Sequence, residues 1–239
     1  MEYKVIDGKG IIPDGATEIR VSAFKGCNSL QSIEIPDSVT QIGDEAFTGC
    51  SSLQSIVIPD SVTEIGRWAF AYCTSLQSIE IPDSVTQIDG SVFFRCNNLT
   101  SIIVSKNNSR YKSTNNCILT KDGKKLVLCR NHNIPDSVTE IGDYAFDGCT
   151  SLQSIDIPNS VTEIRAYAFS GCTSLQSIDI VTQEKEPDLS LERIKHLLQA
   201  LSEYSKVISL RVPIGCGYAY RHYPAFEGKF QKIIAAIDV

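Results

Sequence analysis

Basic residues are a minority in this sequence, and their shortage narrows the range of partners. There are 22 Lys and Arg against 28 Asp and Glu, which gives a formal net charge of −6 at pH 7, and the sequence pI is about 5.1. A protein that binds nucleic acid usually presents a positive field to the phosphate backbone. Nucleic acid is therefore not expected as a partner.

Long apolar segments are also missing. No run of apolar residues approaches the length of a membrane span. Residues 1–10 are polar and charged, without the apolar centre of a signal peptide. We therefore expect no membrane insertion and find no export signal in the chain as given, although a chain trimmed of its signal would look the same. The sequence does not decide whether the protein resides in the cytoplasm, at the cell surface or outside the cell.

Residues that carry out catalysis or bind metals are few and dispersed. The three histidines, His132, His196 and His222, lie far apart in the sequence and have no assignable acid–base partner. The sequence contains no C-x-x-C pair, the close spacing on which zinc sites depend. Serine is common, but it recurs at the same places in a repeat, whereas a catalytic residue is usually singular. We predict no enzyme activity, no catalytic residue, no metal site and no cofactor.

The sequence is, in contrast, rich in one repeated unit. Five segments agree almost letter for letter, and a sixth, at 12–34, is more divergent. The five are 35–57, 58–80, 81–103, 134–156 and 157–179. Copies begin every 23 residues, except where the 30 residues of 104–133 intervene. One such unit is too short to enclose a core, so stacked units are predicted to bury one another's apolar faces in a continuous column.

The spacing of apolar residues within a copy indicates which side chains point inward. The segment LQSIEIP predicts a short strand with Leu30, Ile33 and Ile35 inward and Ser32 and Glu34 outward, because side chains alternate along a strand. The Pro-Asp-Ser that follows predicts a turn. Residues 43–50 are too few for a sizeable helix and are predicted to form one helical turn on the convex side. The inward set of this copy is Val39, Ile42, Ala46, Phe47, Cys50, Leu53, Ile56 and Ile58.

The repeated pattern I-P-x-S-V-T-x-I, followed by A-F, C and L-Q-S-I, resembles the BspA-like leucine-rich repeats of bacterial and some protist surface proteins. The resemblance covers residues 12–179 closely. Residues 104–133 are similar to that family's irregular longer repeat, in which N-N-x-x-Y precedes a hairpin. Asp122-Gly123 is a hairpin-turn signal in its own right. The resemblance implies an α/β, right-handed leucine-rich-repeat solenoid, with short parallel strands on one face and short helical turns on the other. It implies a role in adhesion and recognition but identifies no ligand.

Both ends depart from the repeat. Ser190 is a suitable N-cap, and the apolar residues after it predict an amphipathic helix of about 14 residues. These residues are Leu191, Ile194, Leu197, Leu198 and Leu201. Residues 208–213 predict a strand, and 212–234 resemble the family's C-terminal cap. The predicted organisation is an N-terminal edge at 1–11, repeats at 12–103, the long repeat with its hairpin at 104–133, repeats at 134–182, and the helix and cap at 183–239.

The chain has nine cysteines, six of which recur once per repeat. These six are Cys27, Cys50, Cys73, Cys96, Cys149 and Cys172. Matched side chains on stacked strands point in parallel, which does not suit the near-perpendicular torsion of a disulfide. We therefore predict a buried ladder of structural thiols and nine free cysteines in all.

Acidic residues also recur, at the turn of each repeat. They are Asp37, Asp60, Asp83 and Asp136, with Asn159 at the fifth position. Calcium could neutralise such a column of like charges. The Asn at the fifth position, and the Pro and Ser beside each acid, instead favour side chains that cap their own turns.

Positions that differ between copies indicate where a partner would bind, because a spacer has no use for variation on an exposed face. The strand-face positions are Glu34, Val57, Glu80, Ile103, Asp156 and Asp179. The convex positions are Glu45, Trp68, Ser91, Tyr144 and Tyr167. We favour the strand face, since a partner there touches several repeats at once, whereas the convex aromatics can also simply cover neighbouring turns. The predicted function is a recognition module for protein or glycan. The alternative is a structural spacer or assembly element, and the oligomeric state is left open.

Overall fold

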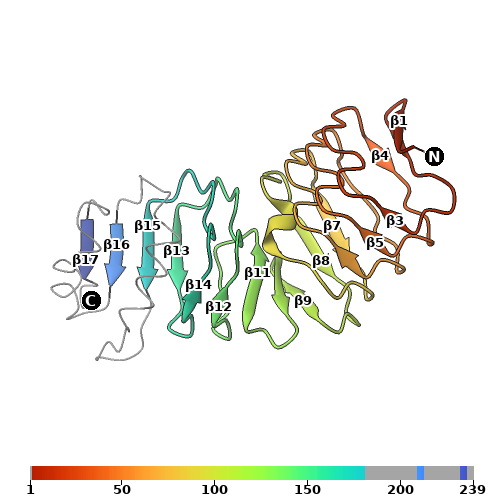
Figure 1. Cartoon of the computed structure of the whole chain (residues 1–239). Coiled ribbons are helices and arrows are strands. Elements are labelled where there is room, and N and C mark those ends of the chain that lie inside the picture. The colour runs from red at the N-terminus through yellow and green to blue at the C-terminus, as the bar shows by residue number, and fades with distance from the viewer. Residues whose placement is uncertain (1, 181–208, 213–231, 236–239) are drawn as a thin grey trace. The chain divides into compact units, whose positions relative to one another are not determined.

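The computed structural model describes residues 2–180, 209–212 and 232–235 (Figure 1). The chain divides into two compact units. Unit 1 comprises Met1–Asp122 and Val127–Arg130, and unit 2 comprises Gly123–Leu126 and Asn131–Val239. Each unit is a stack of coils, in which one coil is one 23-residue repeat. The predicted solenoid of stacked repeats is therefore confirmed within each unit.

Two ladders of parallel strands run through unit 1. The first ladder is formed by the S-I-x-I segments and is interrupted once: β2 (Lys9–Ile11) pairs with β4 (Ser32–Ile33), and β7 (Ser78–Ile81) pairs with β8 (Ser101–Val104), but the intervening coil contains no strand at residues 53–58. The antiparallel strand β1 (Lys4–Ile6) closes its N-terminal edge. The second ladder is formed by the T-x-I segments, β3 (Glu18–Ile19), β5 (Gln41–Ile42) and β6 (Glu64–Ile65), and a bridge from Glu64 extends it to Gln87.

Unit 2 repeats this arrangement. Its first ladder contains β13 (Ser154–Ile157), β15 (Ser177–Ile180), β16 (Ser209–Val212) and β17 (Lys232–Ala235), all parallel. Its second ladder pairs β12 (Glu140–Ile141) with β14 (Glu163–Ile164) and with the start of β11 (Lys125–Cys129). The prediction of strands on one face was therefore incomplete, because the T-x-I segments form a second ladder.

The long repeat contributes a β-hairpin to unit 1. Strand β9 (Tyr111–Thr114) pairs antiparallel with β10 (Cys117–Thr120) through a turn at Asn115 and Asn116. Both turn residues have positive φ, 49° and 57°, as the preferred two-residue hairpin turn requires. The sequence-based prediction placed a hairpin turn only at Asp122-Gly123, between β10 and β11, and missed this one.

The third side of each coil consists of turns, and the predicted helical turn is wrong. The described residues contain no α-helix, and their single 3-10 helix is η1 (Gly90–Phe93). Glu45 has φ 56°, which a right-handed helix cannot accommodate. The backbone N–H of Phe47 donates to Ala69 O of the next coil at 2.7 Å, and Gly49 N donates to Ala71 O at 2.7 Å. These bonds between coils alternate with turn bonds within the coil, from Thr48 N to Glu45 O at 3.0 Å and from Cys50 N to Phe47 O at 3.1 Å, so no continuous helix forms.

The core of unit 1 is a column of matched side chains. Phe24, Phe47, Phe70 and Phe93 are almost fully buried, and successive rings stack with centroids 5.3, 5.3 and 5.7 Å apart. Tyr3 covers the end of this column edge-on, 5.5 Å from Phe24. All eight residues predicted to point inward between Val39 and Ile58 are buried. The strand alternation is also confirmed, since Leu30, Ile33 and Ile35 are buried whereas Ser32 and Glu34 are exposed.

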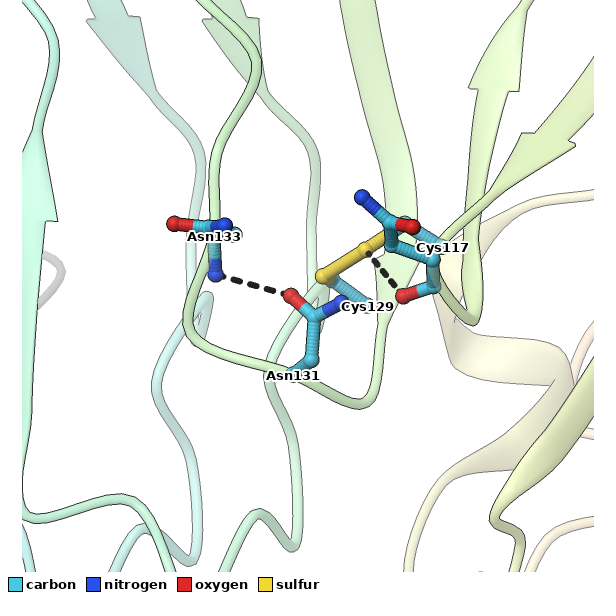
Figure 2. The surroundings of a disulfide bond; sticks show 5 residues. Cys117, Cys129, Asn131 and Asn133 are labelled. Carbon is cyan, nitrogen blue, oxygen red and sulfur yellow. Dashed lines mark hydrogen bonds between the residues drawn. A yellow bond between two sulfur atoms is a disulfide. The ribbon is translucent and has the colours of Figure 1, made fainter.

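The predicted buried cysteine ladder is confirmed at four of its six positions, whereas Cys27 and Cys149 are only partly buried. The prediction of nine free thiols is wrong. The six repeat cysteines are not disulfide-bonded. The four buried thiols, those of Cys50, Cys73, Cys96 and Cys172, donate to phenylalanine carbonyls. Cys73 Sγ, for example, lies 3.2 Å from Phe47 O of the preceding coil. Cys117 and Cys129, in contrast, form a disulfide (Figure 2). These two residues do not occupy matched ladder positions but lie on β10 and β11, so the argument from parallel side chains does not apply to them.

Beyond the repeats the structure describes only β16 and β17. Strand β16 confirms the strand predicted at 208–213. The amphipathic helix predicted from Leu191 to Leu201, and most of the cap predicted at 212–234, lie outside the described residues.

Candidate binding faces

The first ladder of unit 1 presents a row of exposed residues at one register position. Its five members follow one another at intervals of 23 residues: Ile11, Glu34, Val57, Glu80 and Ile103. We call these five residues the strand-face row. The pairing of Gly10 with Ile33 brings Ile11 and Glu34 to matched positions, and Glu80 pairs directly with Ile103. Val57 lies in the coil between these two sheets, where no strand forms, and the 23-residue repeat gives its place in the row.

The apolar members of the strand-face row are unusually accessible. Val57 is 80% exposed, Ile103 is 51% exposed and Ile11 is 39% exposed. Glu34 and Glu80 between them are also exposed. Sequence reasoning missed Ile11 because it precedes the first copy and lies in the predicted N-terminal edge, although its position one period before Glu34 is a usable signal.

In unit 2 the matched positions are Asp156 and Asp179, which pair in register on β13 and β15. Asp156 is exposed and Asp179 is partly buried. The next register position, on β16, is occupied by Arg211. The sequence repeat ends before β16, so Arg211 could not be assigned to this row from the sequence.

The convex candidates lie on the turn side, where most of them contact neighbouring coils. Glu45 forms an ion pair with Lys25, and the ring of Trp68 lies 5.4 Å from that of Phe94. In unit 2, Tyr144 and Tyr167 stack with centroids 5.2 Å apart, and Tyr167 is 41% exposed. Ser91 is buried and is therefore no longer a candidate for a convex surface site.

Two further residues distinguish the turn side of unit 1. Four coils carry a glycine with positive φ at the same place: Gly26, Gly49, Gly148 and Gly171. Tyr72 and Arg95 occupy this place in the other two coils, with φ of 58° and 60°. A side chain in the left-handed region costs about 1 kcal/mol or more. Tyr72 is 46% exposed and meets Phe94 edge-on at 5.3 Å, so an aromatic cluster accompanies this local strain.

The recurring turn acids do not cap their turns as predicted. Asp37, Asp60, Asp83 and Asp136 are exposed, and none of these four side chains has a hydrogen bond to another described residue. The neighbouring serine makes the side-chain bond instead: Ser61 Oγ donates to Val39 O of the preceding coil at 2.7 Å. A backbone bond from Val39 N to Pro36 O closes the turn.

Burial favours the protonated form of three ladder thiols, those of Cys27, Cys50 and Cys73. Burial raises the pKa of Cys50 to about 12, with a further increase from neighbouring Cys27. Burial likewise raises the pKa of Cys27 and of Cys73. Because the thiolate is the nucleophile, these cysteines are poorly suited to covalent catalysis. Among the described residues, no group of three or more His, Cys, Asp or Glu is arranged to hold a metal ion.

A family model now accounts for this repeated geometry. The model of the family described as "BspA type leucine rich repeat region" matches the chain in six copies, over residues 9–120 and 125–198. The chain belongs to the BspA-type leucine-rich repeat family. It is thus a leucine-rich repeat module, a fold consistent with a protein-binding scaffold. No curated protein sequence matches the chain.

Solved structures share the BspA-type fold. The pneumococcal vaccine antigen PcpA is 18% identical with a TM-score of 0.57, and the match covers 82% of this chain and 54% of that protein. A leucine-rich repeat protein from Bacteroides ovatus is 25% identical with a TM-score of 0.54, and the match covers 95% and 60% of the two chains. The BspA-type chain therefore spans little more than half the length of these two proteins. Across the described residues, no helix has the length and apolar character needed to cross a membrane.

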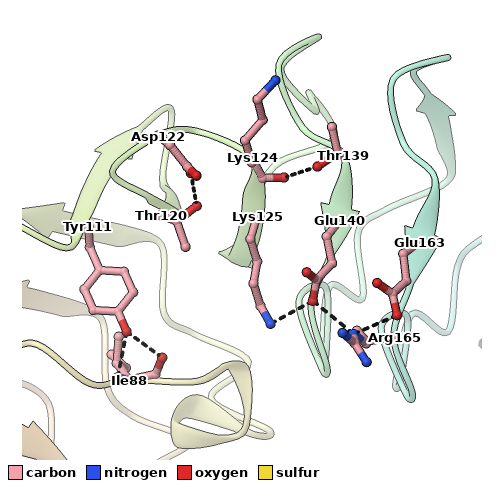
Figure 3. Close-up of polar contacts among 10 residues, drawn as sticks. All are labelled: Ile88, Tyr111, Thr120, Asp122, Lys124, Lys125, Thr139, Glu140, Glu163 and Arg165. Carbon is pink, nitrogen blue, oxygen red and sulfur yellow. Dashed lines mark hydrogen bonds and ion pairs between the residues drawn. The ribbon is translucent and has the colours of Figure 1, made fainter.

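The N-N-x-x-Y motif of the long BspA-type repeat closes the column of unit 1. Asn108 is fully buried, and its amide nitrogen donates to Pro82 O at 2.7 Å and to Val85 O at 2.9 Å. Its side-chain oxygen accepts the backbone N–H of Tyr111 at 2.8 Å. The Tyr111 hydroxyl accepts from Ile88 N at 3.1 Å and donates to Ile88 O at 3.2 Å (Figure 3). The motif therefore satisfies backbone groups that have no further coil to pair with.

In unit 2 the second ladder carries a charged network on its outer side (Figure 3). Glu140 accepts from Lys125 at 2.8 Å and from Arg165 at 3.0 Å, and Arg165 also lies 3.1 Å from Glu163. Partial burial acts to raise the pKa of Glu140, but the bonds from Lys125 and Arg165 outweigh it and hold that pKa below its ordinary value. These charges are already compensated, so the second ladder of unit 2 is a weaker candidate for a charged partner than the first ladder.

Proposed function

We propose that the chain is a non-enzymatic binding module that contacts a partner protein through the outward positions of its first ladder. The observation that carries the proposal is the strand-face row, in which three apolar residues and two carboxylates are exposed on successive coils. Mixed apolar and charged surfaces of this kind are typical of protein interfaces. The predicted use in adhesion belongs to the same proposal.

Uncompensated charge supports this face over the others. Glu80 has no ion pair with any described residue, and Glu34 has one described cationic partner, Lys9, at 4.0 Å. In unit 2, exposed Asp156 adds one carboxylate at the matched position. Like charges in a row favour a basic partner.

A spacer or assembly element without a specific ligand is the alternative function. A spacer gains nothing from an exposed apolar side chain, and that of Val57 is 80% exposed. A glycan is the second candidate ligand, and it fits the turn side better, because sugars stack on aromatic rings. Tyr72 and Tyr167 are exposed there, whereas the strand-face row contains no aromatic residue.

A charge-reversal experiment tests the assignment of the strand face. The purified chain is screened against extracellular-matrix proteins and glycans, and binding is measured again for the Glu80→Lys, Asp156→Lys double variant. We expect binding to be markedly weakened while the free energy of unfolding stays within about 1 kcal/mol of the parent, since exposed substitutions rarely cost more.

Two comparison variants make the result specific. Asp37→Lys with Asp136→Lys makes the same change in net charge, one residue in each unit, on exposed turn positions, and it should leave binding intact. Trp68→Ala with Tyr144→Ala tests the turn side. Loss of binding in this last variant alone would place the site among the convex aromatics and refute the proposal.

A further inference from the structure

The strand-face row alternates strictly between apolar and acidic residues. Ile11, Val57 and Ile103 are apolar, and Glu34 and Glu80 stand between them. The 23-residue repeat does not require this order, because the architecture leaves the outward position free to vary. The alternation therefore has a period of two coils, twice the period of the fold itself.

The outward position beside the strand-face row varies little from coil to coil. The adjacent outward position is serine in four coils, Ser32, Ser55, Ser78 and Ser101, and Lys9 in the first. The row thus stands as a line of apolar and acidic residues on a largely neutral polar surface. A partner that follows this line meets an apolar contact, then a carboxylate, in regular succession.

The spacing of the line follows from strand geometry. Backbone hydrogen bonds join successive coils, for example from Phe24 N to Ala46 O and from Gln77 N to Gln54 O. At the spacing of hydrogen-bonded strands, about 4.8 Å, residues of the same kind recur about every 9.6 Å, and the five positions span about 19 Å. In an α-helix, with a rise of about 1.5 Å per residue, positions three residues apart are separated by about 4.5 Å and positions seven apart by about 10.5 Å. One seam of a helix therefore matches both the spacing and the alternation.

We infer that the partner segment is an α-helix lying along the strand-face row, with apolar residues every seventh position and Lys or Arg between them. This inference rests on the proposed function of the first ladder as a protein-binding face. The mismatch of about 0.9 Å per two coils is small compared with the reach of a flexible lysine side chain. The carboxylates of Glu34 and Glu80 supply the charge complementarity that orients the helix.

Other backbone conformations fit the row less well. An extended strand presents residues to one side about every 6.6 Å, which falls out of step with coils about 4.8 Å apart. A polyproline helix repeats about every 9.3 Å and would match the apolar residues. Its intermediate residues, however, point to other sides of its threefold axis, so it could not place a basic group over each carboxylate.

Two synthetic peptides of equal composition test the inference. In the helix-register peptide, Leu recurs every seventh residue with one Lys between successive leucines, on an alanine-rich background. In the strand-register peptide, the same Leu and Lys residues alternate at every second position. Fluorescence anisotropy measures the binding of each peptide to the full chain.

We expect the helix-register peptide to bind at least about tenfold more tightly than the strand-register peptide. Val57→Ser and Glu80→Lys should each weaken its binding by about tenfold, and the exposed control Asp37→Lys should not. A peptide with Glu in place of Lys should bind the Glu34→Lys, Glu80→Lys variant and not the parent. Circular dichroism should show the helix content of the bound peptide rising.

Equal binding of the two peptides, tighter binding of the strand-register peptide, or no binding of the helix-register peptide would overturn the inference. The inference would also be overturned if Glu80→Lys left the affinity for the helix-register peptide unchanged. The proposed function has a separate readout, because a natural protein captured through Glu80 and Asp156 would preserve it even if the helical peptide fails. If a natural partner binds equally well after Glu80 and Asp156 are both replaced by Lys, the proposed function itself is refuted.

Discussion

At the residue scale, the Tyr111 hydroxyl substitutes for a neighbouring strand. Within the second ladder of unit 1, Ile65 N donates to Gln87 O at 3.3 Å, and Ile42 O accepts from Gly66 N at 2.7 Å. The equivalent groups of Ile88 both bond to Tyr111 Oη instead. A hydroxyl can do this because it is a donor and an acceptor at once.

Tyr111→Phe should therefore destabilise the chain by about 1–3 kcal/mol, because it leaves a buried N–H and C=O without partners. Urea denaturation followed by circular dichroism measures the change. Tyr72→Phe is the matched control, since the hydroxyl of Tyr72 is on an exposed residue and has no hydrogen bond within the described chain. An equal effect of the two substitutions would show that the Tyr111 hydroxyl does not satisfy Ile88.

Phe146 is the corresponding test of the apolar column in unit 2. It is fully buried and stacks on Phe169 with centroids 5.2 Å apart. Phe146→Ala should cost about 3–5 kcal/mol, because it empties an aromatic site between coils. Chemical denaturation of this variant beside the exposed control Thr150→Ala measures the loss. A Phe146→Ala variant that unfolds like the parent would mean that the inward register is wrong.

At the scale of elements, the long repeat is the part of the chain that departs most from its neighbours. Its hairpin places Cys117 on β10, while Cys129 lies at the end of β11. Arg130 N then donates to Asn116 O at 3.1 Å. The disulfide thus fastens two segments that are not matched positions of stacked coils.

Thiol titration tests directly whether the disulfide between Cys117 and Cys129 forms. In denaturant without reductant, at most seven of the nine cysteines should react, because two are joined in the Cys117–Cys129 bond. After reduction all nine should react. A variant with serine at both positions should give the same value before and after reduction. Nine reactive thiols in the unreduced parent would show that this bond does not form in the isolated chain.

At the scale of the whole molecule, the parallel register continues beyond the repeats. Strand β15 pairs with β16, and β16 pairs with β17, although the 23-residue pattern ends near Ile180. These two strands cover the edge of β15 that a further repeat would otherwise occupy. An uncovered edge would expose apolar coil surface to water.

Deletion of residues 212–239 should therefore cause fraying or aggregation, because it removes β17 and the end of β16. Size-exclusion chromatography and the midpoint of thermal unfolding measure the outcome. Trimming only residues 236–239 leaves both strands intact and should have little effect. A soluble and equally stable 1–211 chain would show that the stack is closed by other residues.

The sequence by itself determined the period, the column and its outward positions. Near-identical copies separate the residues that packing requires, such as Phe47 and Cys50, from those it leaves free, such as Val57. The inward set is correct because strand alternation and burial are local consequences of apolar spacing. The same comparison identified the family, since the motif is long and occurs repeatedly.

Only the tertiary structure decided how the turns are bonded and where the long repeat closes the column. Residues 43–50 look like a short helical turn in isolation. The next coil, however, accepts the N–H groups of Phe47 and Gly49, which favours left-handed backbone at Glu45. The pairing of Cys117 with Cys129, the second strand ladder and the bonds from Tyr111 to Ile88 likewise depend on segments brought together by stacking. A pattern within one repeat cannot specify these contacts, because the partner groups belong to other repeats.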